Sequence, residues 1–225
     1  MSLSGPRKPS AGLFYMFCDE QRFEHPGTIS FVTGHVAVPQ DAWSRLPEHR
    51  RLLVQPSNLP RAARIQKLLH DLDGVAVITG SKIPRKHIPP KERDSTADIK
   101  SMARSDHIWS VTMAFGIVAT LKALELQNLI ATTVDVYYDS KALTESHRNT
   151  FIKVVTVQIQ KSIQKDSLNK TRVRRFSEVA KAEPNKNPTK FQAGTLLADK
   201  LLKPARRDGL RERSSIVSGS LAKDG

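Results

Sequence analysis

The sequence predicts an α/β domain in which helices flank a mixed sheet of about five strands. Short runs rich in apolar and β-branched residues alternate with stretches of helical periodicity along most of the 225 residues. A His-Pro-Gly turn at 25–27 precedes the second run, which favours an antiparallel hairpin at the start of the sheet. With 39% hydrophobic residues, the chain can also bury a core.

Five segments have the composition of strands, namely 13–19, 28–38, 74–79, 132–139 and 171–181. The first and third are short and almost wholly apolar, which is typical of buried strands, while the second and fourth are rich in β-branched residues. The third is followed by a long loop from 80 to 100 that contains several prolines and many basic residues. Loops of this length are usually functional or disordered.

Three helices are expected to follow the third strand, at 106–127, 145–165 and 189–202. The first has apolar residues on most faces and should be buried, whereas the second is amphipathic. Two further short helical stretches form an insertion at about 40–71, between the second and third strands. This order of elements is that of ribonuclease H-like domains, although several other α/β folds begin in the same way.

The two ends of the chain differ in composition from the domain between them. Residues 1–10 are rich in Ser, Pro and basic residues and predict a disordered arm, and 204–225 predict a flexible basic tail. The folded domain is therefore expected at 11–203.

The chain carries 36 Lys and Arg against 22 Asp and Glu, a net charge of +14. So large an excess attracts polyanions, either nucleic acid or an anionic membrane surface. The basic residues are dispersed rather than gathered on one helix face, which argues against a membrane partner. Nucleic acid, either DNA or RNA, is the expected partner.

Cys18 is the single cysteine, which excludes an intrachain disulfide and a zinc site built on several thiolates. We expect it to be a buried, unreactive thiol. Neither a membrane-spanning segment nor a signal peptide is predicted, so a cytoplasmic location is expected. The chain also lacks the Gly-rich loop of nucleotide-binding proteins and the Gly-x-Ser-x-Gly turn of serine hydrolases.

Three carboxylates occupy positions at which a metal site could form. Asp19 is expected to end the first strand, Asp139 ends the fourth, and Asp199 lies at the border of the buried face of the last helix. Carboxylates that meet at one sheet edge repel each other unless cations hold them, and hard oxygen ligands suit Mg²⁺ or Mn²⁺. Two such ions can activate water and stabilise the leaving oxygen in phosphodiester hydrolysis.

Each of these carboxylates also has a purely structural interpretation. Asp139 could begin a turn by bonding its own backbone. Asp19 and Glu20 could form the polar end of a strand, and Asp199 could pair with Lys203 one helical turn later.

A fourth metal ligand could come from Asp106 at the start of the long helix, where a carboxylate also interacts favourably with the helix dipole. Asp98 and Glu125 are alternatives to it. Basic residues in the long loop and near the fifth strand are candidates for contacts with phosphates: Lys82, Arg85, Lys86, Arg172, Arg174 and Arg175. A solvated charge run is the alternative for these residues.

Several short motifs occur in order along the chain: FCDEQR, ISFVTGHVAVP, ITGSKIPRK, VDVYYDSKAL and KFQAGTLLADKLL. Over about residues 13–203 this pattern resembles the domain-of-unknown-function 3800 family of bacteria and phages, whose members are regarded as ribonuclease H-like. The resemblance implies an acidic cluster with two accessory residues beside it, made of Asp19, Asp139, Asp199, Glu20 and Gln192. This chain has Gln21 and Arg22 where the family has Ser-Gly.

The first hypothesis is therefore a metal-dependent nuclease that uses Mg²⁺ or Mn²⁺ at Asp19, Asp139 and Asp199. The second is a non-catalytic module of the same fold that binds nucleic acid within a larger assembly. The third is a protein-interaction component of a phage or defence system, with a protein partner or a second copy of the chain bound to it.

Overall fold

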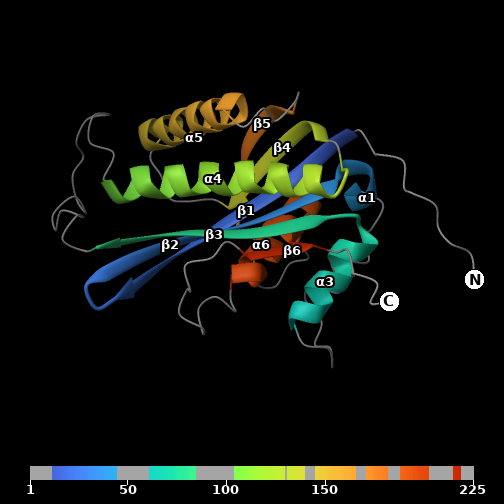
Figure 1. Ribbon diagram of the computed structural model, residues 1–225, viewed down its shortest axis with the longest axis horizontal. Coiled ribbons are helices and arrows are strands. Elements are labelled where there is room, and N and C mark those ends of the chain that lie inside the picture. Colours follow the sequence, from blue (N-terminus) through green and yellow to red (C-terminus); the bar gives the residue numbers. More distant parts are fainter. Residues whose placement is uncertain are drawn as a thin grey trace, which may run out of the picture.

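The fold of this computed structural model is built on a mixed β-sheet (Figure 1). In the described part of the chain it has six strands in the order β5-β4-β1-β2-β3-β6. Their bounds are β1 Gly12–His25, β2 Thr28–Pro39, β3 Val75–Pro84, β4 Ala131–Asp139, β5 Arg172–Val179 and β6 Ser215–Ser218. β1, β2, β3 and β6 pair antiparallel, while β4 is parallel to β1 and to β5. The predicted α/β class is confirmed, and the topology is compatible with a ribonuclease H-like domain.

The structure describes residues 12–44, 61–84, 104–129, 131–139, 145–165, 171–181, 188–202 and 215–218. Within these ranges the helices are α1 Gln40–Ser44, α3 Arg61–Asp71, α4 Arg104–Leu126, α5 Glu145–Lys165 and α6 Lys190–Leu202. α4 and α5 lie on one face of the sheet, and α1, α3 and α6 lie on the other (Figure 1). α1 and α3 fall within the insertion expected at about 40–71.

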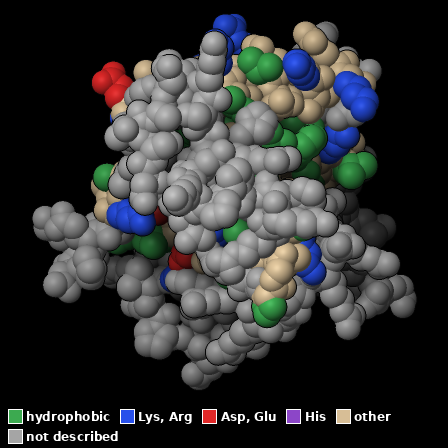
Figure 2. Space-filling model, turned by 90° about the vertical axis from the view of Figure 1, so that its left-hand side faces the viewer, with side chains coloured by type: hydrophobic (Ala, Val, Ile, Leu, Met, Phe, Trp, Pro, Cys, Tyr) green, Lys and Arg blue, Asp and Glu red, His purple; other side chains and the backbone are tan. Residues whose placement is uncertain are grey.

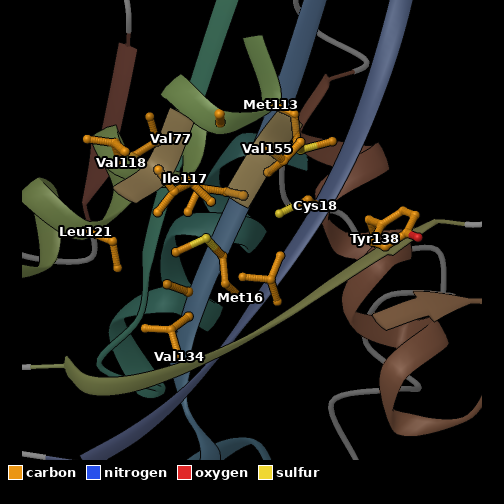
Figure 3. Packing of buried hydrophobic residues seen from close by; sticks show 14 of the residues in the cluster. Met16, Cys18, Val77, Met113, Ile117, Val118, Leu121, Val134, Tyr138 and Val155 are labelled. Carbon is orange, nitrogen blue, oxygen red and sulfur yellow. The ribbon is translucent and has the colours of Figure 1, made fainter. Parts of the chain in front are cut away.

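Two hydrophobic cores form because side chains alternate between the two faces of each strand. On one face Met16 and Val134 meet Met113, Ile117 and Leu121 of α4 (Figure 3). The opposite face packs against α1, α3 and α6 through a cluster rich in aromatic residues that includes Tyr15, Phe17, Trp43, Tyr137 and Leu197. The position of β1 in the middle of the sheet explains why it contributes to both cores.

Two strands are longer than the sequence predicts. β1 continues past Asp19 to His25, and β3 continues past residue 79 to Pro84. Residues 28–32 of β2 pair with both extensions, so the three strands hydrogen-bond to one another well beyond the point where β4 ends. Lys82 therefore lies on a strand, where a loop was expected.

β6 was also not expected, since it lies within the segment predicted to be a flexible tail. Its four residues pair with residues 75–78 of β3. The expectation is wrong for 215–218, because Ile216 and Val217 favour a strand when the edge of β3 offers them a partner. The rest of that tail and the arm at 1–10 lie outside the described residues.

α4 is the core helix of this domain. Its Ile108–Leu126 stretch is long and apolar enough to cross a membrane, which corrects the expectation that the chain has no such segment. However, 67% of that stretch is buried inside the protein, where it packs against β2, β3 and α5. This burial is the arrangement of a soluble protein, in which an apolar helix completes the core.

A buried polar network lies between the sheet and α4. The Nδ1 atom of His35 is 3.2 Å from the Sγ atom of Cys18, and its Nε2 atom is 2.8 Å from the hydroxyl of Thr33. Thr33 in turn hydrogen-bonds the hydroxyl of Thr79 at 2.8 Å. Burial lowers the pKa of His35 to about 3 and raises the pKa of Cys18, so the imidazole is neutral and the thiol protonated. Cys18 is thus buried, as predicted, and poorly reactive.

Candidate functional site

The pairing of β1 with β4 brings two of the predicted carboxylates together. In this parallel register Cys18 faces Tyr138, so the next residues, Asp19 and Asp139, lie side by side where the ladder stops. β4 ends at Asp139 as predicted. The prediction that Asp19 ends β1 is wrong, because the strand continues through its hairpin with β2.

The third carboxylate comes from α6, which crosses the same face of the sheet. Asp19 pairs with Gly34 of β2, and a Cβ atom added at Gly34 would lie 3.0 Å from the backbone oxygen of Ala198. The helix therefore approaches the sheet backbone directly beside Asp199. From β1, the side-chain amide of Gln21 donates a hydrogen bond of 3.3 Å to Asp199 Oδ1.

The electrostatics of Asp19 show that these carboxylates affect one another. Asp19 is only 8% exposed, and burial, followed by repulsion from Glu20, raises its pKa to about 8. Asp139 and Asp199 raise the pKa further, while the 2.8 Å hydrogen bond from the Glu20 backbone N–H lowers it. The Nζ atom of Lys181 lies 3.9 Å from Asp139 Oδ2. At neutral pH Asp19 therefore binds a proton unless another cation replaces it.

Asp19, Asp139 and Asp199 would all bind a metal through carboxylate oxygens, and hard oxygen ligands of this kind suit Mg²⁺ or Mn²⁺. In the described ranges, however, no group of three or more His, Cys, Asp or Glu side chains is placed to hold a metal ion. The carboxylates are thus near enough to repel one another, but their side chains do not surround a common point.

The candidates for a fourth ligand lie elsewhere. Asp106 falls in the first turn of α4, which covers the opposite face of the sheet from α6, and its side chain is outside the described part. Glu125 is exposed near the end of the same helix, and Asp98 lies outside the described residues. Lys203, the predicted structural partner of Asp199, also lies outside them.

Gln192, an expected accessory residue, fixes the start of α6. Its Oε1 atom accepts a 2.9 Å hydrogen bond from the Thr189 backbone N–H, and its own N–H donates to Thr189 Oγ1 at 3.3 Å. This reciprocal pair is a capping box. The Nε2 atom of Gln192 also donates to the carbonyls of Ala180 and Lys181, at 3.0 and 3.2 Å. Gln192 therefore ties α6 to the chain just after β5, which positions the helix that carries Asp199.

Gln21 and Lys181 are the site residues that sequence reasoning missed. Gln21 lies two residues after Asp19 and so on the same face of β1, a relation that becomes visible only when the strand extends that far. Lys181 follows β5, which is parallel to β4, so it comes to the same end of the sheet as Asp139. The capping pattern Thr-x-x-Gln before α6 was a local signal that could have identified the role of Gln192.

The predicted basic residues are spread over the molecule. Lys82 is exposed on β3, while Arg85 and Lys86 lie outside the described residues. Figure 2 shows Lys and Arg side chains on the upper part of one face, with hydrophobic side chains exposed between them.

The three arginines of β5 differ in their surroundings. Arg172 is exposed, and Arg174 forms a two-point ion pair with the buried Asp135, with its Nε atom 2.9 Å from Oδ1. A register shift explains this geometry, because Val134 pairs with Val173 and Asp135 pairs with Arg175, which leaves Arg174 as the extra residue of a β-bulge. Arg174 is still about half exposed, so it stabilises the sheet without being removed from solvent.

No family model matches the chain, and a search of curated proteins finds no match either.

Proposed function

We propose that this protein is a divalent-metal-dependent nuclease that hydrolyses phosphodiester bonds in DNA or RNA in the cytoplasm. The observation that carries the proposal is that Asp19, Asp139 and Asp199, from β1, β4 and α6, are near enough to repel one another. The net charge of +14 supports nucleic acid as the substrate, because so large an excess of basic residues attracts a polyanion. The resemblance of its motifs to those of the domain-of-unknown-function 3800 family agrees with the proposal.

The three carboxylates would hold Mg²⁺ or Mn²⁺, which would activate water and stabilise the leaving oxygen. Asp19 would exchange its proton for the cation, since burial beside like charges disfavours its ionised form in the absence of a cation. Gln21 orients Asp199 through its amide, and the backbone N–H of Glu20 orients Asp19. The pairing of β1 with β4 already places Asp19 and Asp139 side by side.

Substitution of Asp139 tests the nuclease. We expect wild-type protein to cleave labelled DNA or RNA oligonucleotides when Mn²⁺ or Mg²⁺ is added, and Asp139→Asn to show no measurable cleavage while keeping the wild-type circular dichroism spectrum. Asp71→Asn on α3 is the matched control, because it removes an exposed carboxylate far along the chain from the cluster. Equal cleavage by the wild type and Asp139→Asn, or no cleavage by the wild type with any divalent metal, would contradict the proposal.

A non-catalytic nucleic-acid-binding module is the second candidate. It is favoured by the finding that no three acidic or metal-binding side chains of the described residues surround a common point. A thermal melt with and without Mn²⁺ separates the two. A site that closes on the ion gains about 2.7 kcal/mol when the ion is present at a hundred times its Kd, which raises Tm, whereas a degraded site leaves Tm unchanged.

A further inference from the structure

A cavity of about 660 Å³ opens between α5 and β5, at the outer edge of the sheet. β5 ends the sheet on this side in the described part of the chain. The floor of the cavity is apolar, because Ile159 and Ile163 of α5 face Val173 and Phe176 of β5. Beside this row, Gln160 adds a polar side chain one residue after Ile159. The cavity therefore combines an apolar base with polar walls.

The charged side chains that line the cavity are positive, as in an anion-binding site. Arg172, Arg174 and Arg175 line it, and no Asp or Glu occurs among the described residues of its lining. Arg174 is engaged by Asp135 and Arg175 by Tyr137, so Arg172, which is exposed, is the arginine best placed to meet a ligand. α5 adds the exposed Lys153, Lys161 and Lys165 on its surface. A ligand that fills this cavity should thus carry negative charge together with apolar or aromatic groups.

The cavity and the acidic cluster lie on opposite faces of the sheet, because α5 covers one face and α6 covers the other. β5 runs parallel to β4, and its Phe176 pairs with Val136, three residues before Asp139. At roughly 3.3 Å per residue, the inner end of the cavity lies about 10 Å along the sheet from Asp139. A ligand in the cavity would therefore have to pass around the end of the sheet to reach the carboxylates.

Two features argue against a peptide that adds a strand to β5. The bulge at Arg174 interrupts the regular hydrogen-bonding pattern of the strand, and its arginines place charge along the edge. Duplex nucleic acid would contact the arginines through phosphates but would leave the apolar floor unused. Unpaired nucleotides use both features, since phosphates meet the arginines while exposed bases pack on apolar side chains.

We propose that the cavity between α5 and β5 binds an unpaired stretch of nucleic acid. Arg172 contacts a phosphate, Gln160 and Gln164 hydrogen-bond to base edges or sugars, and Ile163 supports a base. Binding in the cavity agrees with the nucleic-acid partner of the proposed function but does not rest on the nuclease activity.

Fluorescence anisotropy of a labelled 15-nucleotide single strand, measured on the full chain in EDTA, tests the proposal. The single strand is expected to bind more tightly than a duplex of the same length, and Arg172→Glu should weaken its binding about tenfold. Gln164→Ala, an exposed change without charge, should weaken the single strand but not the duplex. Lys67→Glu on α3 matches the charge change of Arg172→Glu and should alter binding less than about twofold.

Three outcomes would overturn the proposal: equal affinity for duplex and single strand, equal effects of Arg172→Glu and Lys67→Glu, or displacement of the single strand from this cavity by an acidic peptide at lower concentration. A circular dichroism spectrum of each variant shows that its fold is intact. The same assay in Asp139→Asn separates the two proposals. Retained binding in that variant, with no cleavage by the wild type, would refute the nuclease and support the cavity.

Discussion

Replacing Asp19 with asparagine is expected to make the protein more stable at alkaline pH, although the change removes a proposed active-site residue. Burial and neighbouring carboxylates raise the pKa of Asp19 to about 8, from an ordinary value near 3.8. The folded state thus holds a proton that the unfolded state has released, so the free energy of unfolding decreases as pH rises from about 4 to about 8. The slope is about 1.4 kcal/mol for each pH unit, and above pH 8 the loss is complete.

Urea denaturation in EDTA at pH 5 and pH 9 measures this effect. The gain in stability of Asp19→Asn over the wild type should be about 4 kcal/mol larger at pH 9 than at pH 5. His35 titrates in the opposite sense, because its lowered pKa costs stability as pH falls below about 6.5. That contribution is common to both proteins and cancels from the comparison. Stability curves of the two proteins that run parallel would contradict the raised pKa of Asp19.

Replacing Gly116 with alanine is expected to destabilise the fold by about 3 kcal/mol, the upper range for an overpacked core. Gly116 lies in α4 directly over His35, and an added Cβ atom would overlap the imidazole Nε2 atom. The imidazole has little freedom to withdraw, since it is fully buried and contacts both Cys18 and Thr33. Urea denaturation measures the loss, and Gly12→Ala is the control because an added Cβ atom there meets nothing within 4 Å.

The double variant Gly116→Ala with His35→Ala shows whether this overlap is the cause. Removal of the imidazole provides space for the new methyl group, so the two changes should be less harmful together than the sum of their separate effects. Additive losses, or a Gly116→Ala protein as stable as the wild type, would mean that α4 moves away from the sheet to accommodate the methyl group.

The parts of the fold that follow from local pattern could be predicted from the sequence. α5 spans Glu145–Lys165 as expected, despite its valines, because an apolar stripe at helical spacing packs on α4. β4 ends at Asp139 as expected, since an apolar run gives way there to polar residues.

The parts that depend on distant partners could not be predicted. The far half of β1 carries charged residues and covers no core, so only its pairing with β2 makes it a strand. β6 likewise forms because it pairs with β3, which lies more than 130 residues earlier in the chain. In the site, the position of Asp139 followed from the predicted end of its strand and that of Asp199 from the apolar face of its helix, whereas Asp19 lies within β1 and not at its end. The bond from Gln21 to Asp199 and the ion pair of Arg174 with Asp135 join residues far apart in sequence, for which no local pattern exists.

The distance between Asp199 on α6 and the carboxylates on β1 and β4 depends on the absence of a side chain at Gly34. Gly34 lets the backbone of α6 rest on β2, and a methyl group at that position would meet both Ala198 and Leu202. Any larger residue would act as a spacer and would raise Asp199 away from Asp19 without altering a single acidic group. The spacing of the carboxylates in the proposed site therefore depends on glycine at position 34. A chain with every carboxylate intact but with a larger residue at that position would lose the close spacing of its acidic cluster.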